Sequence, residues 1–205
     1  MKNTAKNKFV VFTFGRFQGF TKAHAGLFKY ILKYSKKIGA DHRIYVSQTE
    51  DNEDNPLSYV TKLYLLRKIF PKMNFVCDTT IKTPFDALYN LQDCLYENVY
   101  MVAGPDRAGE YYDRISKYWV GSQTFKSSTP LNNILFFNHF DVMQFNYGNR
   151  SNISGTKLRE AVKNRDWSEF WKHSYSSHLD SSEQFEAIWE KYQMSKKINT
   201  IKGQK

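Results

Sequence analysis

Short apolar runs alternate with helical stripes over the first half of this chain, and this alternation constrains its fold more than any other feature. Uninterrupted apolar runs of about 4 to 8 residues predict buried strands, while apolar side chains at helical spacing predict amphipathic helices. The runs that predict strands are Phe9–Phe14, Arg43–Val46, Asn74–Cys77 and Val99–Ala103, and a helical stripe stands between each consecutive pair. Strands that alternate with helices predict a parallel sheet with right-handed crossovers. We therefore expect an α/β fold whose parallel sheet is flanked by helices.

The second half of the chain predicts a small addition to this sheet and a helical extension. Apolar runs at Ile134–Phe137 and Val142–Phe145 predict one or two further strands. Beyond Arg165, large aromatic residues recur at helical spacing and predict two amphipathic helices that form a cap or a contact between copies of the chain. We expect residues 8–163 to form one domain, residues 164–195 to form the helical C-terminal extension, and the basic residues 196–205 to be disordered.

The chain is basic, with 30 lysine and arginine residues, 20 acidic residues and a net charge of +10. Lysines cluster at both ends of the chain, so we expect an anionic small-molecule partner rather than a nucleic acid. The only cysteines are Cys77 and Cys94, which are too few for a disulfide framework or a zinc site and are typical of a cytoplasmic protein. No apolar run approaches the roughly 18 residues of a membrane span, so we expect no membrane insertion.

A loop with phosphate-binding chemistry follows the first predicted strand. It contains Gly15–Gln18 and Thr21–His24, at the point where the apolar run gives way to a helix. Gly15 lets the backbone approach a ligand closely, and the free N–H groups at a helix N-terminus attract phosphate. The same loop supplies the Arg16 guanidinium and the His24 imidazole. This combination suits a nucleoside triphosphate, whereas an isolated histidine on the first turn of a helix more often has a structural role.

A second loop-to-helix segment, Ile153–Arg159, also suits an anion. Ser154 is a predicted N-cap, because Leu158 and later apolar residues recur at helical spacing after it. Thr156 lies near the first turn and Arg159 about one turn later, so their side chains can face the same anion. Taken alone, the segment is equally consistent with a capped helix that carries an exposed arginine.

Together, the two segments resemble the signature motifs of the nucleotidyltransferase superfamily, (H/T)xGH and ISxTxxR. Thr21 and His24 match the outer positions of the first motif, and Gly15–Gln18 resembles the GRFQ form of the nicotinamide-mononucleotide adenylyltransferases. Gly19 stands where the pattern has proline, and Ala23 stands where it has glycine. The resemblance implies a Rossmann-like nucleotidyltransferase domain.

The resemblance also implies a reaction and a set of site residues. The reaction is transfer of a nucleoside monophosphate to a phosphorylated small-molecule acceptor, with release of pyrophosphate. The implied catalytic residues are His24, Thr21 and Arg159. The implied nucleotide-binding residues are Phe14, Gly15, Arg16, Phe17, Gly104, Asp106, Arg107, Ile153, Ser154 and Thr156. For Asp106, a turn or N-cap role is as open as nucleotide contact. The sequence shows no protein cage for a metal, so we expect Mg²⁺ to arrive on the triphosphate.

The motifs leave the substrates open. The GRFQ form favours transfer of AMP from ATP to an acceptor such as nicotinamide mononucleotide, a step of NAD biosynthesis. A cytidylyltransferase that uses CTP and a phospho-sugar or phospho-alcohol shares the same motifs. A third alternative is a catalytically silent module that keeps the nucleotide fold and binds a partner. The presence of Thr21, His24, Thr156 and Arg159 argues against the silent module.

Overall fold

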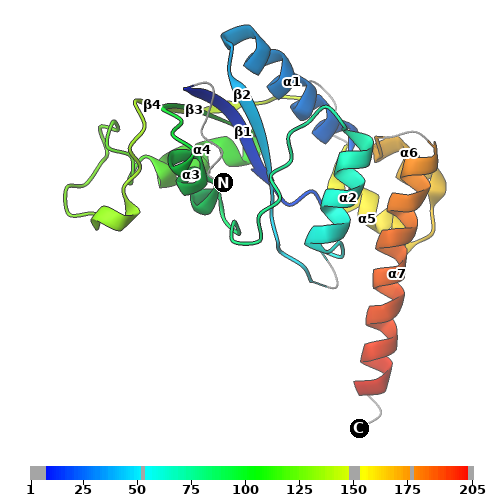
Figure 1. Ribbon diagram of the computed structural model, residues 1–205. Coiled ribbons are helices and arrows are strands. Elements are labelled where there is room, and N and C mark those ends of the chain that lie inside the picture. Colours follow the sequence, from blue (N-terminus) through cyan, green and yellow to red (C-terminus); the bar gives the residue numbers. More distant parts are fainter. Residues whose placement is uncertain (1–7, 52–53, 148–152, 176–177, 203–205) are drawn as a thin grey trace. The chain divides into compact units, whose positions relative to one another are not determined.

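The computed structural model describes residues 8–51, 54–147, 153–175 and 178–202 (Figure 1). Contacts divide these residues into two compact units. The first unit comprises residues 8–15, 27–45 and 73–146, and the second comprises the described parts of 16–26, 46–72 and 147–205. Both units are discontinuous in the sequence, and the continuous domain ranges predicted from the sequence stay a prediction.

A four-stranded sheet with the order β2-β1-β3-β4 organises the first unit. Its strands are β1 (Phe9–Gly15), β2 (Asp41–Val46), β3 (Asn98–Ala103) and β4 (His139–Gln144), and the sheet is parallel, as predicted. β1 pairs with β3 from Phe9↔Asn98 to Phe12↔Met101. Because β2 and β3 lie on opposite sides of β1, the strand order reverses between β1 and β3. Gly15 ends β1 and Gly104 follows β3, so both lie at the carboxyl edge, where α/β sheets bind ligands.

One predicted strand is wrong. Residues Asn74–Cys77 form only a single parallel bridge, Ile44↔Phe75, and the fourth strand of the sheet is β4, which overlaps the predicted run Val142–Phe145. Phe75 is buried and its ring packs edge-on against Phe28. The apolar pattern at this segment therefore reports burial of side chains rather than pairing of a strand. The run Ile134–Phe137 also stays outside the sheet, where it makes one bridge to Trp119.

The core of the first unit lies between the sheet and helix α3 (Pro84–Asp93). A capping box at Thr83 and Asp86 begins this helix, with Pro84 at its first position. The apolar face of α3 packs against β1 and β3 through Ala87, Leu88, Leu91, Val10, Phe12, Val99 and Met101. Helix α4 (Pro105–Ile115) was not predicted, because it buries little more than Ala108 and Ile115 and so leaves a weak apolar stripe.

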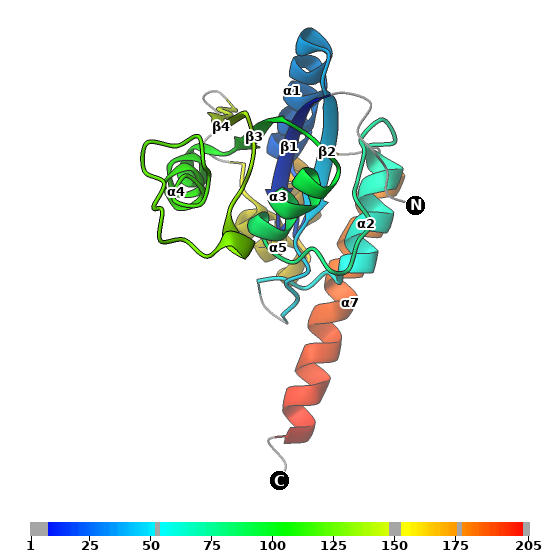
Figure 2. The ribbon, with the colours of Figure 1, turned by 60° about the vertical axis from the view of Figure 1, so that its left-hand side comes forward.

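The second unit is helical. It contains the start of α1 (Lys22–Ile38), and α2 (Tyr59–Ile69), α5 (Gly155–Lys163), α6 (Trp167–His173) and α7 (His178–Lys202). The Trp167 ring stacks on Phe185 with centroids 3.7 Å apart, and Phe170 packs edge-on against Phe185, so the predicted aromatic stripes form the joint between α6 and α7. α7 runs beside α2, as Figures 1 and 2 both show, and an ion pair of 2.5 Å joins Lys68 to Glu183.

Helix α7 extends to Lys202 and so enters the range 196–205, for which the sequence predicts disorder. None of the helices in the described part of the chain is both long enough and apolar enough to cross a membrane.

Candidate active site

The loop after β1 takes a conformation that favours glycine at one position. Gly19 has a φ of +101°, which L side chains rarely adopt, and the preceding Phe17 has a φ of +47°. A Cβ atom on Gly19 would lie 2.7 Å from Leu158 Cδ2 of α5. Proline holds φ near about −65° and cannot adopt this loop conformation. The departure from the family pattern at position 19 therefore has a local structural cause.

Thr21 and His24 contact each other at the start of α1. The Thr21 N–H donates to His24 Nδ1 at 3.2 Å, and the His24 N–H donates to Thr21 Oγ1 at 3.3 Å. The Thr21 hydroxyl also lies 3.2 Å from His24 Nδ1. The Phe17 ring meets the imidazole edge-on, with centroids 5.2 Å apart. These contacts fix the orientation of the imidazole relative to the loop.

His24 is neutral at physiological pH. Burial of the ring lowers the pKa of His24 to about 4, although the residue keeps some exposure, and a hydrogen bond with the Gly19 backbone opposes the shift. Because Nδ1 accepts from the Thr21 N–H, the single proton of the neutral ring lies on Nε2. The neutral ring has one N–H, and a ligand oxygen would accept from it in place of the Gly19 backbone.

Helix α5 begins as the sequence predicts and packs against the first-motif loop. The Ser154 hydroxyl is the N-cap and accepts from the Lys157 N–H at 3.0 Å. Arg159 Nη1 donates to the backbone oxygen of Gln18 at 3.2 Å, and Arg159 Nη2 lies 3.4 Å from Thr156 Oγ1. The two motifs, far apart in the sequence, thus form one continuous structure within the second unit.

The Arg159 guanidinium has an anionic partner that a ligand can replace. Its side chain is 12% exposed, and Nη2 lies 3.5 Å from Oδ1 of Asp54, whose side chain is 72% exposed. Ion pairs with such exposed partners contribute at most about 1 kcal/mol. A polyphosphate carries several charges, so it is a stronger partner than one exposed carboxylate. Arg159 is therefore held where an anion can bind it.

Gln18 has a role that sequence analysis missed. Its buried side chain donates from Nε2 to the carbonyl oxygens of Leu57 (3.0 Å) and Thr49 (3.1 Å), and its Oε1 accepts from the Leu57 N–H at 2.8 Å. With its backbone oxygen bound by Arg159, Gln18 joins the first motif, the second motif and the segment after β2. The amide is the feature of the GRFQ segment that could have indicated this, because a buried glutamine needs several hydrogen-bond partners.

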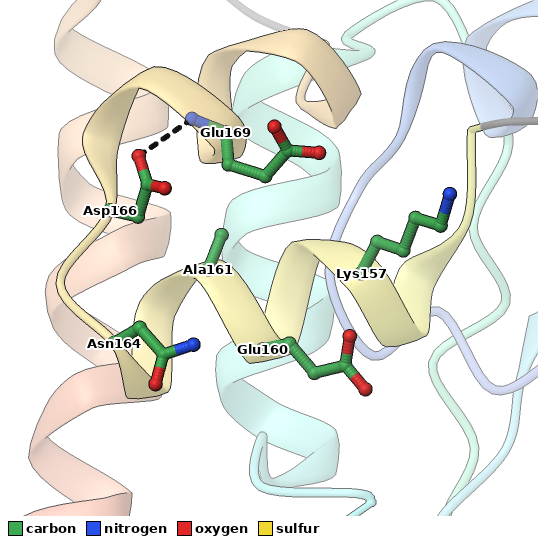
Figure 3. Close-up of a pocket in the computed structure, with 6 residues that line it drawn as sticks. All are labelled: Lys157, Glu160, Ala161, Asn164, Asp166 and Glu169. Carbon is green, nitrogen blue, oxygen red and sulfur yellow. Dashed lines mark hydrogen bonds between the residues drawn. The ribbon is translucent and has the colours of Figure 1, made fainter.

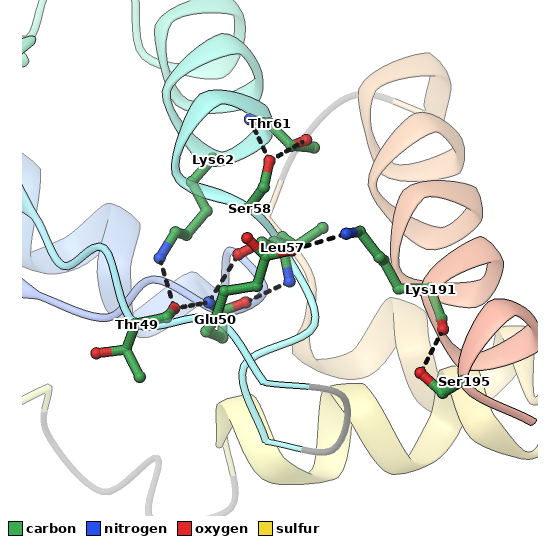
Figure 4. Close-up of polar contacts among 9 residues, drawn as sticks. Thr49, Glu50, Leu57, Ser58, Thr61, Lys62, Lys191 and Ser195 are labelled. Atoms are coloured by element: carbon green, nitrogen blue, oxygen red, sulfur yellow. Dashed lines mark hydrogen bonds and ion pairs between the residues drawn. The ribbon is translucent and has the colours of Figure 1, made fainter. Parts of the chain in front are cut away.

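Lys62 supports the same segment from α2 and was also missed (Figure 4). The residue is 0% exposed, and its Nζ donates to the backbone oxygens of Ser47 (2.5 Å) and Thr49 (3.3 Å). Burial lowers the pKa of Lys62 to about 8, and the charge of Glu50 opposes that shift. Lys191 of α7 pairs with Glu50 at 2.7 Å. The sequence feature that could have indicated this role is a lysine that lies, by helical spacing, on the buried side of α2.

The remaining predicted site residues are reported for each unit separately. In the first unit, Gly104 is the N-cap residue of α4, Phe14 and Gly15 are half-buried, and the Arg107 guanidinium pairs with Glu110 at 3.0 Å. Asp106 lies in the first turn of α4, whose N-cap residue is Gly104, so the N-cap alternative is wrong for Asp106. In the second unit, Arg16 is exposed, Phe17 is buried and Ile153 is half-buried.

A cavity of about 280 Å³ lies beside α5 (Figure 3). Its lining residues are Lys157, Glu160, Ala161, Asn164, Asp166 and Glu169. None of the predicted site residues lines it, and its carboxylates are unsuited to binding a polyphosphate. The described residues contain no group of three or more side chains that could hold a metal ion.

Solved structures of an adenylyltransferase are similar to this chain. They are two structures of Plasmodium falciparum nicotinic acid mononucleotide adenylyltransferase, complexed with APC and with NaAD. Both are 14% identical to this chain and cover 86% of it and 94% of their own length, with TM-scores of 0.55 and 0.57. No family model and no curated protein matches the chain. The likeness confirms the Rossmann-like α/β fold that the resemblance implies.

Proposed function

We propose that this chain, which has the fold of a nucleotidyltransferase, transfers AMP from MgATP to a pyridine mononucleotide and releases pyrophosphate. The observation that carries the proposal is the joining of the two motifs, in which Arg159 binds the backbone of Gln18 and Leu158 packs on Gly19. An anion-binding guanidinium is thereby attached to the loop that holds Thr21 and His24. The similar adenylyltransferase, which acts on nicotinic acid mononucleotide by its name, supports the choice of acceptor.

The proposed reaction needs positioning and charge stabilisation rather than covalent catalysis. An oxygen of the acceptor phosphate attacks the α-phosphorus of ATP, a new P–O bond forms, and the bond to the bridging oxygen of pyrophosphate breaks. His24 Nε2–H donates to the phosphoryl oxygens as negative charge develops, beside the Thr21 hydroxyl. Arg159, Ser154 and Thr156 bind the β and γ phosphates, and Arg16 binds a substrate phosphate. Mg²⁺ enters as part of the MgATP substrate.

The decisive experiment measures pyrophosphate release from ATP and, separately, from CTP, with and without nicotinic acid mononucleotide or nicotinamide mononucleotide. We expect release only with ATP and one of these acceptors. In the His24→Ala variant, kcat should fall by a factor on the order of a hundred or more with little change in ATP affinity, because a donor to the transition state is lost. Between pH 6 and 8, the His24-dependent part of kcat should stay constant, since the pKa of His24 is about 4.

His139→Ala is the matched control, because His139 is an exposed histidine of β4 in the first unit. Its kcat should equal that of the wild type. Equal losses of ATP affinity and turnover in His24→Ala would remove the transition-state role of His24. Release from CTP with a phospho-alcohol would favour a cytidylyltransferase. ATP binding without release for every acceptor would favour a silent module.

A further inference from the structure

The C-terminal helices are bonded to the backbone of the first-motif loop. Ser174, directly after α6, forms an antiparallel bridge with Thr21, and the Tyr175 N–H donates to the backbone oxygen of Phe20 at 3.0 Å. Lys22 Nζ donates to the backbone oxygens of Lys172 (3.0 Å) and Trp171 (3.3 Å), at the C-terminal end of α6. The loop therefore has partners of its own in the C-terminal extension, and all of these residues belong to the second unit.

One side chain of α7 completes this attachment. The Phe20 N–H donates to Gln184 Oε1, and Gln184 Nε2 donates to Ser174 Oγ at 3.2 Å. Ser174 Oγ in turn lies 3.1 Å from Ser181 Oγ. Gln184 is 0% exposed, so both ends of its amide are paired away from water. A buried amide is favourable only when its donor and its acceptor both form hydrogen bonds. Here one partner is Phe20 of the loop, and the other is Ser174, whose backbone is bridged to Thr21 of the same loop.

We propose that Gln184 is a positioning residue for the imidazole of His24. It acts through the backbone: Gln184 fixes the Phe20 N–H, Phe20 precedes Thr21, and the Thr21 N–H donates to His24 Nδ1. Gln184 touches neither His24 nor the proposed phosphate site directly. The C-terminal extension, which the sequence predicts to form a cap or a contact between copies of the chain, is then also a part of the active-site scaffold. The effect of Gln184 on turnover rests on the proposed function, whereas its effect on the conformation of the loop does not.

The test compares Gln184→Met with Gln193→Met, a control on the same helix at a half-buried position. Methionine keeps the approximate length of glutamine and removes both hydrogen bonds. We expect kcat of Gln184→Met to fall about 10- to 100-fold, as a misplaced catalytic group causes, with the KM for ATP changed less than about threefold. Ser174→Ala keeps the backbone bridge and removes the acceptor of Gln184 Nε2, so it should give a smaller loss in the same direction.

Two measurements test the positioning without any turnover. In Gln184→Met, the Phe20 amide should exchange with solvent at least tenfold faster, and the pKa of His24 followed by NMR should move from about 4 toward 6.5 as the ring loses its burial. Gln193→Met should change neither. If Gln184→Met does not fold, the same measurements on Ser174→Ala decide the question.

Unchanged amide exchange, His24 pKa and kcat in a destabilised Gln184 variant would overturn the proposal and leave Gln184 a structural residue only. If the wild type releases no pyrophosphate while the exchange and the pKa change as expected, the proposed function fails and the positioning by Gln184 stands.

Discussion

A side chain introduced at position 19 should destabilise this protein, although the first nucleotidyltransferase motif has proline at that position. Two effects oppose any L-residue at this position. The φ of +101° is strained for a side chain, and a Cβ atom would lie 2.7 Å from Cδ2 of Leu158, which is fully buried and has little room to move. The prediction therefore follows from the backbone and from packing, and it does not depend on the proposed reaction.

The magnitude follows from these two effects. A non-glycine residue in a rarely populated region of φ and ψ costs on the order of 1–3 kcal/mol, and overpacking of a buried site costs about 1–3 kcal/mol more. The free energy of unfolding of Gly19→Ala should therefore fall by about 2–6 kcal/mol. For a chain of this size, about 1 kcal/mol corresponds to a shift in Tm of roughly 2–4 °C, so we expect a loss on the order of 10 °C.

Gly39→Ala separates the two effects. Gly39 also has a positive φ, +66°, but a Cβ atom there would meet nothing within 4 Å. Its substitution should cost only the backbone strain, about 1–2 kcal/mol. The difference between the two alanine variants, measured by urea denaturation and thermal unfolding, gives the packing contribution together with the extra backbone strain of a φ of +101° over one of +66°. Leu158→Ala combined with Gly19→Ala should destabilise less than the sum of the single variants, by about 1–3 kcal/mol, because the clash is removed.

A Gly19→Pro variant as stable as the wild type would refute this reasoning, since proline cannot adopt the φ of this loop. A cost in Gly19→Ala no larger than that in Gly39→Ala would refute the packing contribution alone.

Two further predictions concern charge. Arg159→Ala should weaken ATP binding at least tenfold in calorimetry, because a charged hydrogen-bond partner of the phosphates is lost. Asp54→Asn should tighten ATP binding about two- to fivefold, because it removes a competing exposed ion pair. Unchanged affinity in Arg159→Ala would make the second motif a helix cap only. The pKa of Lys62 is about 8 in the folded protein against an ordinary value of 10.5. Between pH 8 and 10.5 the unfolded chain therefore binds more protons than the folded chain. This group makes the free energy of unfolding rise by about 3 kcal/mol over that pH range. Lys62→Met should lack that rise in urea denaturation between pH 8 and 10.5, and an identical rise in both proteins would contradict the lowered pKa.

Features that depend on near neighbours could be predicted from the residues alone. The strand that ends at Gly15 follows from its apolar run, and the Ser154 cap follows from a hydroxyl beside free backbone N–H groups. The fold class could be predicted for the same reason, because it rests on short segments and on their order, whereas the roles of Thr21, His24 and Arg159 stay predictions.

Features that depend on contacts across the chain required the folded structure. The pattern at Asn74–Cys77 could not distinguish a strand from a buried bridge, because both bury alternate side chains. The three hydrogen bonds of Gln18, the contact of Gln184 with Phe20 and the lowered pKa of His24 all arise from groups brought together by packing. Burial and long-range hydrogen bonds are properties of three-dimensional proximity, which spacing along the sequence does not encode locally.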